Sequence, residues 1–177
     1  MGTSESNEAF RDALARFASG VVIGAASTPD GPIGFTASAF SSLSLEPPLV
    51  LLCVAKKASV YARFMQADFV GISVLQADQR WIAEQFARHG VDRFQGVPLR
   101  PDAAVPLIDG AIAQLECSRH GVLDAGDHTI FTGRVLESRT LPGRPLVHYA
   151  RAFGGFSADT LDRARNDQTR SPAGGEA

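Results

Sequence analysis

The chain has 177 residues, a length typical of one domain with a single sizeable core. Hydrophobic residues make up 45% of it and charged residues 20%, and the net charge of -2 argues against a nucleic-acid partner, which would favour a basic excess. Two distant cysteines outside any metal-ligand spacing argue against a disulfide framework and indicate no metal site. A polar N-terminus without a long apolar run indicates a cytoplasmic protein with no membrane partner.

Helical and extended patterns alternate along the first part of the chain. Apolar residues at helical spacing predict an amphipathic helix from Asn7 to Ser19, ended by Gly20. The segment from Val21 to Ser27 leads through the turn Pro29-Asp30-Gly31 into a second extended segment, so the two are predicted to form a hairpin. The continuous apolar run from Leu49 to Ala55 predicts a strand that is buried on both faces.

Further short elements follow. A helix is expected over Ala58 to Gln66, a strand over Phe69 to Leu75 and a helix over Gln79 to Arg88. Glycines and prolines between His89 and Leu107 predict a loop-rich excursion. Strands are then predicted over Ala111 to His120, Thr129 to Ser138 and Leu146 to Phe153, and the polar tail at 158–177 is predicted to be disordered.

The order of these elements predicts the fold class. Regular helical crossovers do not separate the strands, which argues against a parallel doubly wound sheet. We therefore expect a mainly β protein, an antiparallel barrel with a few flanking helices.

Hydroxyl side chains crowd the segment from Gly34 to Leu49, which otherwise has the pattern of a strand and its exit. They belong to Thr36, Ser38, Ser41, Ser42 and Ser44. Hydroxyls and turn-region amides can hydrogen-bond a polar ring edge or a phosphate. The alternative interpretation is a solvated edge strand followed by a serine-rich turn.

Two lysines and a serine lie where a predicted buried strand runs into a predicted helix. The run is Cys53-Val54-Ala55-Lys56-Lys57-Ala58-Ser59. Free amides and the helix dipole favour negative charge at a helix N-terminus, so this pattern predicts an anion site. The alternative is that both lysines are solvated loop charges and that Ser59 is only an N-cap.

A histidine follows the turn Gly126-Asp127 at the entry of a predicted strand. The imidazole of His128 can donate a hydrogen bond to a ligand carbonyl or phosphate, and imidazoles titrate near neutral pH. The alternative is a solvent-facing side chain beside a turn. The other three histidines lack the spacing of a metal site.

Taken in order, these segments resemble the short-chain flavin reductase family, the reductase components of two-component flavin-dependent monooxygenases. The resemblance runs from about Phe10 to Phe156. It rests on Ser19-Gly20-Val21-Val22, the run from Thr36 to Leu49, Gly126-Asp127-His128 and the stretch from Pro145 to Phe153. The sequence contains no nucleophile-elbow motif and no Gly-rich nucleotide-binding motif, so it gives no support to a hydrolase or to a Rossmann fold.

The resemblance implies a fold and a set of site residues. The fold is an FMN-binding split barrel, a Greek-key antiparallel β-barrel over residues 1–157 that works as a homodimer. By this resemblance the flavin lies along Thr36, Ala37, Ser38 and Ser42, and its polar, phosphate-bearing end lies along Cys53, Ala55, Lys56 and Ser59. The nicotinamide is expected at His128, with Arg151 and Phe153 from the later stretch. Ala39 and Ala55 replace the serine and asparagine that are frequent in the family, which implies a modest flavin affinity.

The implied activity is NAD(P)H-dependent flavin reduction. A hydride passes from NADH or NADPH to FMN or FAD, and the reduced flavin supplies a partner monooxygenase. Because the flavin accepts the hydride, no catalytic side chain is expected. The alternative function is a non-catalytic flavin-binding or sensing module on the same barrel, which would not oxidise reduced nicotinamide when flavin is added.

Overall fold

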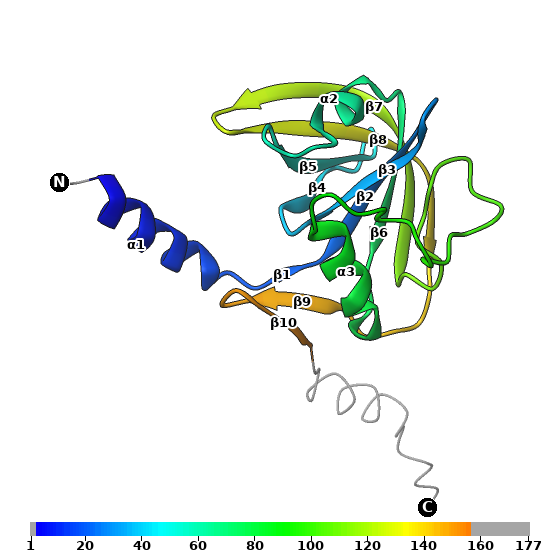
Figure 1. Ribbon diagram of the computed structural model, residues 1–177. Helices are drawn as coiled ribbons and strands as arrows, with labels where there is room; N and C mark the ends of the chain where they lie inside the picture. Colours follow the sequence, from blue (N-terminus) through cyan, green and yellow to red (C-terminus); the bar gives the residue numbers. More distant parts are fainter. Residues whose placement is uncertain (1–2, 157–177) are drawn as a thin grey trace, which may run out of the picture.

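The protein is described from a computed structural model, which covers residues 3–156 with secondary structure and residues 7–156 with side chains (Figure 1). The tail predicted at 158–177 lies outside the described residues. Four helical segments are present: α1 at Thr3–Ala15, α2 at Tyr61–Gln66, the single 3-10 turn η1 at Ala77–Gln79, and α3 at Arg80–Ala87. The first helix therefore begins earlier and ends earlier than the apolar spacing predicts.

Strands make up the body of the protein. They are β1 (Ser19–Gly20), β2 (Val22–Thr28), β3 (Gly31–Ala37), β4 (Phe40–Ser44), β5 (Leu49–Ala55), β6 (Phe69–Val74), β7 (Ala113–Ala125), β8 (His128–Thr140), β9 (Leu146–Tyr149) and β10 (Ala152–Gly155). A seven-stranded sheet has the order β3-β2-β6-β7-β8-β5-β4, and a small sheet has the order β1-β9-β10. Every neighbouring pair is antiparallel, which confirms the mainly β, antiparallel prediction.

The large sheet is strongly curled. β3 and β4 form its two outer edges, yet only Ser38 and Ala39 separate these strands in the sequence. In a flat sheet, a two-residue linker could not reach across the strands that lie between these two edges. The sheet must therefore curl so that its edges approach each other. The Cys53 N–H donates to the Ala39 carbonyl at 2.9 Å, which ties this linker against β5.

Two hydrophobic cores lie on opposite faces of β2. Val22 and Ala26 face the core inside the curl, which also holds Phe64 of α2 and Phe131 of β8. Val21, Ile23 and Ala25 line the core beneath α3 and the small sheet. β2 is thus buried on both faces.

The prediction that the run from Leu49 to Ala55 is buried on both faces is wrong. Val50, Leu52 and Val54 of β5 are buried, whereas the alternate residues are only half-buried. A continuous apolar run does not distinguish a strand between two cores from one that lines an open cavity. The half-buried face of β5 belongs to the candidate site.

The stretch from Leu146 to Phe153, predicted as one strand, is a hairpin. Ala150 and Arg151 form its turn with positive φ angles of 49° and 64°. Such turns usually use Asn or Gly, so the sequence carries no signal for this one. The turn also holds α1, because the Ala150 N–H donates to the Ala15 carbonyl at 2.8 Å and Arg151 Nη2 lies 2.6 Å from Asp12 Oδ1.

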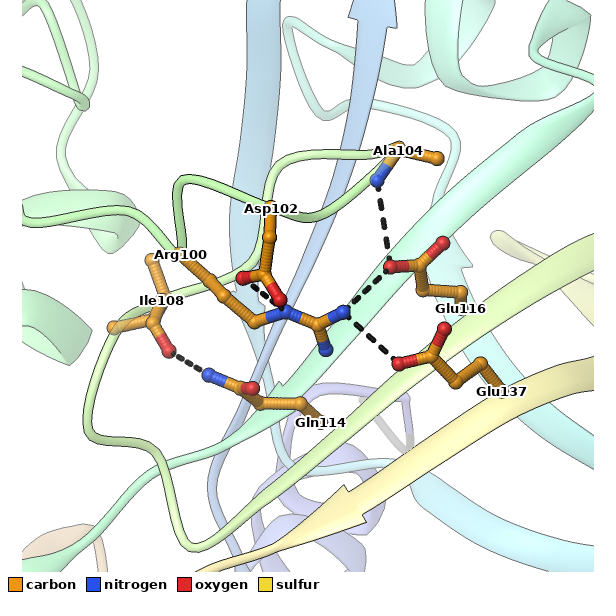
Figure 2. Close-up of polar contacts among 7 residues, drawn as sticks. All are labelled: Arg100, Asp102, Ala104, Ile108, Gln114, Glu116 and Glu137. Carbon is orange, nitrogen blue, oxygen red and sulfur yellow. Dashed lines mark hydrogen bonds and ion pairs between the residues drawn. The ribbon is translucent and has the colours of Figure 1, made fainter.

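A buried arginine fixes the predicted loop-rich excursion between α3 and β7 to the sheet (Figure 2). The Arg100 side chain is 5% exposed, and its guanidinium contacts Asp102 at 3.0 Å, Glu137 at 2.9 Å and Glu116 at 3.3 Å. Glu116 and Glu137 lie on β7 and β8, so the loop is bound to two strands at once. Nearby, buried Gln114 Nε2 donates to the Ile108 carbonyl at 2.6 Å.

The first helix stands away from the sheets (Figure 1). Its apolar stripe does not pack into either core, since Phe10 and Leu14 are 62% and 57% exposed and Phe17 beyond the helix is 77% exposed. Among the described residues, no helix combines the length and apolar character needed to cross a bilayer.

Candidate functional site

A cavity of about 310 Å³ opens beside the linker that joins the two edges of the large sheet. We call it the basic cavity. It is lined by Phe35, Thr36, Ala37, Ser38, Ala39, Cys53, Ala55, Lys57, Ala58, Phe86, Ala87, His89, Arg93 and His128. Lys57, His89, Arg93 and His128 are basic, and within the described part of the chain no carboxylate lines the cavity. Its volume lies at the lower end of the range for small-molecule sites, and its charge favours an anionic ligand.

Strand register places the histidine at this cavity. Ala55 pairs with His128 where β5 meets β8, after the tight turn at Gly126 and Asp127. His128 Nδ1 lies 2.8 Å from Asp127 Oδ1. The hydrogen bond with His128 and the charges of that ring and of Lys57 hold the pKa of the Asp127 carboxyl below its usual range. An ionised Asp127 holds the proton on Nδ1, which leaves Nε2 as the second functional atom of the ring.

The two lysines predicted as an anion site have different environments. Lys56 Nζ donates to Asp124 Oδ2 at 2.5 Å and to the Gly126 carbonyl at 2.7 Å, and its own N–H donates to the Asp127 carbonyl at 2.9 Å. Lys56 therefore fastens the turn that carries His128. Lys57 lines the basic cavity.

The wall formed by β3 depends on α3. Thr36 Oγ1 donates to the Ala83 carbonyl at 2.6 Å, so this hydroxyl hydrogen is used within the protein. A Cβ placed on Gly34 would lie 2.7 Å from Cε1 of Phe86. The glycine therefore lets α3 approach β3 closely enough for Phe86 to line the cavity.

Arg93 is a partly buried cation that no pattern in the sequence indicates. Its Nη1 donates to the Gly34 carbonyl at 2.8 Å, its Nε and Nη2 donate to the Arg88 carbonyl, and Nη2 donates to Ser59 Oγ at 3.3 Å. Burial lowers its pKa from the usual arginine value. Within the described residues all of its hydrogen bonds go to neutral acceptors, so its charge is available to an anion.

A second, larger cavity of about 570 Å³ lies between α1 and the sheet, and we call it the apolar cavity. Leu14, Phe17, Phe40 and Leu51 provide much of its lining. Arg11, Ala15, Ser19, Ser38, Ala39, Ser41, His148 and Arg151 complete it. Ser38 and Ala39 line both cavities, so the two lie on either side of the same linker.

The structure brings together six of the eleven predicted site residues. Thr36, Ala37, Ser38, Cys53, Ala55 and His128 line the basic cavity. Ser42 and Lys56 line neither of the two cavities, and Ser59 lies in a neighbouring one. Arg151 lines the apolar cavity, and Phe153 packs edge-on against His148 with ring centroids 5.5 Å apart. The assigned roles of all eleven residues stay predictions.

His89, Arg93 and Phe86 complete the cavity without a sequence signal. Phe86 is an apolar residue of the helix expected over Gln79 to Arg88, and an apolar helix residue predicts burial and not a ligand wall. His89 and Arg93 belong to the loop-rich excursion, whose path is set by distant contacts such as those of Arg100. No local spacing reveals such contacts.

Comparison with known proteins assigns the family. Residues 14–157 match the family model described as "Flavin reductase like domain". The chain is 44% identical to the FMN reductase (NADH) SmoA of Agrobacterium fabrum, over 86% of this chain and 88% of that protein. It is 42% identical to the reductase component of the flavin-dependent trigonelline monooxygenase of Acinetobacter baylyi, over 81% of this chain and 47% of that protein.

A solved structure has the same fold. The NADH:FAD oxidoreductase SgcE6 of Streptomyces globisporus, solved in complex with NAD and FAD fragments, superposes with a TM-score of 0.82. The match covers 90% of this chain and 98% of that chain at 36% identity. From the extent of the family match and the identity to these relatives, this chain belongs to the family of proteins built on the flavin reductase-like domain.

Proposed function

We propose that this protein is an NAD(P)H-dependent flavin reductase that binds FMN or FAD in the basic cavity and supplies reduced flavin to a partner monooxygenase. Relatives that are named as NADH-dependent reductases of FMN and of FAD support the activity and both flavins. A relative named as a monooxygenase reductase component supports the partner. The observation that carries the assignment to this site is a cavity whose basic side chains have no lining carboxylate among the described residues.

The lining of the basic cavity fits the chemistry of a flavin from one end to the other. Phe35 and Phe86 provide apolar surface for an aromatic ring system, and Ser38 and the surrounding backbone provide polar groups for its edge. Lys57 and Arg93 provide charge for a phosphate. A bound flavin supplies the hydride-accepting chemistry, while the protein binds and orients the reactants.

His128 orients the nicotinamide in this proposal. With Nδ1 donating to Asp127, Nε2 is the ring nitrogen left to bond the carboxamide of the nicotinamide. The bond positions the substrate and requires no proton transfer. Arg151 and Phe153, on the β9–β10 hairpin, extend the nicotinamide site only if the dinucleotide crosses the linker from the basic cavity towards the apolar cavity.

The fold and assembly are further parts of the proposal. The close approach of the β3 and β4 edges and the tie from Cys53 to Ala39 support a split barrel over residues 1–157. The exposed apolar stripe of α1 and the apolar cavity beneath it support a homodimer, because apolar surface of this kind is usually covered by a partner.

Steady-state kinetics tests the function. Oxidation of NADH and NADPH is followed at 340 nm with FMN, FAD or no flavin added, under anaerobic conditions with cytochrome c as the final acceptor. The proposal expects oxidation that depends on added flavin and saturates with it. Flavin binding without nicotinamide oxidation would instead identify the non-catalytic binding or sensing module.

A further inference from the structure

A third cavity continues the basic cavity, and we call it the arginine cavity. It has a volume of about 170 Å³, and the polar and charged side chains of its lining are those of Ser59, Arg63, Asp92 and Arg93. At three places in the chain, residues next to each other in the sequence line the two different cavities: 34 and 35, 58 and 59, and 89 and 90. Arg93 lines both cavities. The two cavities therefore adjoin each other.

The charges of the arginine cavity suit a second anionic group. Arg63 in the last turn of α2 and Arg93 provide two guanidinium groups, and Asp92 is the lining carboxylate within the described residues. Asp92 Oδ1 accepts a hydrogen bond from the Phe94 N–H at 3.0 Å, so this carboxylate caps its own loop. Ser59 Oγ, bound by Arg93 Nη2 at 3.3 Å, lies at the junction and can also donate to a ligand.

We infer that the arginine cavity holds the second phosphate and adjoining ribose of a dinucleotide, and that this dinucleotide is FAD. The inference rests on the proposed function, which places the first flavin phosphate at Lys57 and Arg93. A group joined to that phosphate has to leave the basic cavity beside Arg93, and the arginine cavity is the adjoining space there. Arg63 is then the residue that distinguishes FAD from FMN, since FMN ends at the first phosphate.

The same chemistry is present in NADH, which also carries a diphosphate and an adenosine. The observations favour FAD because the arginine cavity adjoins the phosphate end of the proposed flavin site. The reduced nicotinamide has to reach the ring end, near His128.

The test measures the dissociation constants of FMN and FAD by flavin fluorescence for the full chain and for Arg63→Ala, Arg63→Lys and Arg134→Ala. Arg134 is an exposed arginine in the middle of β8 that lines neither cavity, so its variant controls for loss of one positive charge. We expect the ratio of the FAD constant to the FMN constant to rise about fivefold to twentyfold in Arg63→Ala, because one charge-assisted hydrogen bond is lost at an exposed site. Arg63→Lys should restore part of the ratio, and Arg134→Ala should leave it unchanged.

Other outcomes overturn the inference. An unchanged ratio in Arg63→Ala would exclude a role for Arg63 in FAD selection. A raised KM for NADH with FMN as acceptor, at an unchanged ratio, would assign the cavity to the nicotinamide dinucleotide. Failure of the unaltered protein to bind either FMN or FAD would instead overturn the proposed function itself, so the two failures are distinguishable.

Discussion

The basic and apolar cavities lie on either side of Ser38 and Ala39 but differ in how they are built. The basic cavity is enclosed by β3, β5, α3 and the loop after it, and its Arg93 is held by hydrogen bonds to the Gly34 and Arg88 carbonyls. The apolar cavity is bounded by α1, which touches the rest of the protein mainly through the Ala150–Arg151 turn. A preorganised charged wall suits a small ligand, whereas a loosely held apolar wall suits a second protein surface.

A substitution on α1 should give the largest effect, because it tests the apolar cavity as a dimer surface. Leu14→Asp places a charge on the exposed stripe of α1, so a dimer that buries this stripe should lose at least 100-fold in association. Light scattering at micromolar concentration should then give the monomer mass. Leu14→Met retains the apolar surface and should retain the dimer mass. A monomer mass for the unaltered chain would contradict the proposed role of the apolar cavity.

A substitution of Arg93 tests the basic cavity as the flavin site. Arg93→Met should weaken FMN binding by about 100-fold, because a charge-assisted contact and the support of the loop are lost together. Riboflavin, which has no phosphate, separates these two causes. If only the anion contact is lost, its binding stays unchanged; if the variant loses riboflavin to the same extent as FMN, Arg93 acts through the loop and not through its charge.

The neighbouring lysines provide a matched pair. Lys57→Ala should lower flavin affinity about tenfold to 100-fold, since its ammonium lines the cavity. Lys56→Ala removes the contact with Asp124 and Gly126 and tests the phosphate role predicted from the sequence. Fluorescence titration of both variants distinguishes them. A larger loss in Lys56→Ala than in Lys57→Ala would restore the original assignment.

The histidine should affect the other substrate. His128→Ala should raise the KM for NADH, or lower kcat/KM, by about fivefold to thirtyfold, as expected for one lost hydrogen bond. The dissociation constant of FMN should change little. If the variant loses FMN affinity and keeps its KM for NADH, His128 belongs to the flavin site.

Much of the fold could be predicted because local patterns and tertiary structure agree. The β2–β3 hairpin follows from Pro29-Asp30-Gly31, where Gly31 has a φ of 108°, and the β7–β8 hairpin follows from the turn at Gly126. The β9–β10 hairpin could not be predicted, because Ala150 and Arg151 have no turn preference. The burial of β2 on both faces depends on its packing against α3 and the small sheet. The spacing of apolar residues within β2 does not reveal that packing.

The candidate site likewise has residues that the sequence predicts and residues that only distant contacts bring to it. Thr36, Ala37, Cys53 and Ala55 line the cavity from β3 and β5, two strands that the sequence pattern predicts, and Ser38 directly follows β3. Which of two adjacent lysines faces the cavity depends on Asp124, a residue 68 positions away from Lys56. The arginines at 63 and 93 are brought to one place by α2 and a long loop, and that contact is not encoded in any local spacing.

The two cysteines provide the most direct test of flavin binding in the basic cavity. Cys53 lines that cavity and is partly accessible, whereas Cys117 is fully buried, and burial together with the nearby Glu116 raises the pKa of its thiol to about 12. A thiol reacts with iodoacetamide as the thiolate, so at pH 8 Cys117 should stay unlabelled and serve as the internal control. Mass spectrometry should show one label, at Cys53, whose rate of formation falls at least tenfold when FMN is saturating. Labelling of Cys53 at the same rate with saturating FMN would contradict a flavin in this cavity.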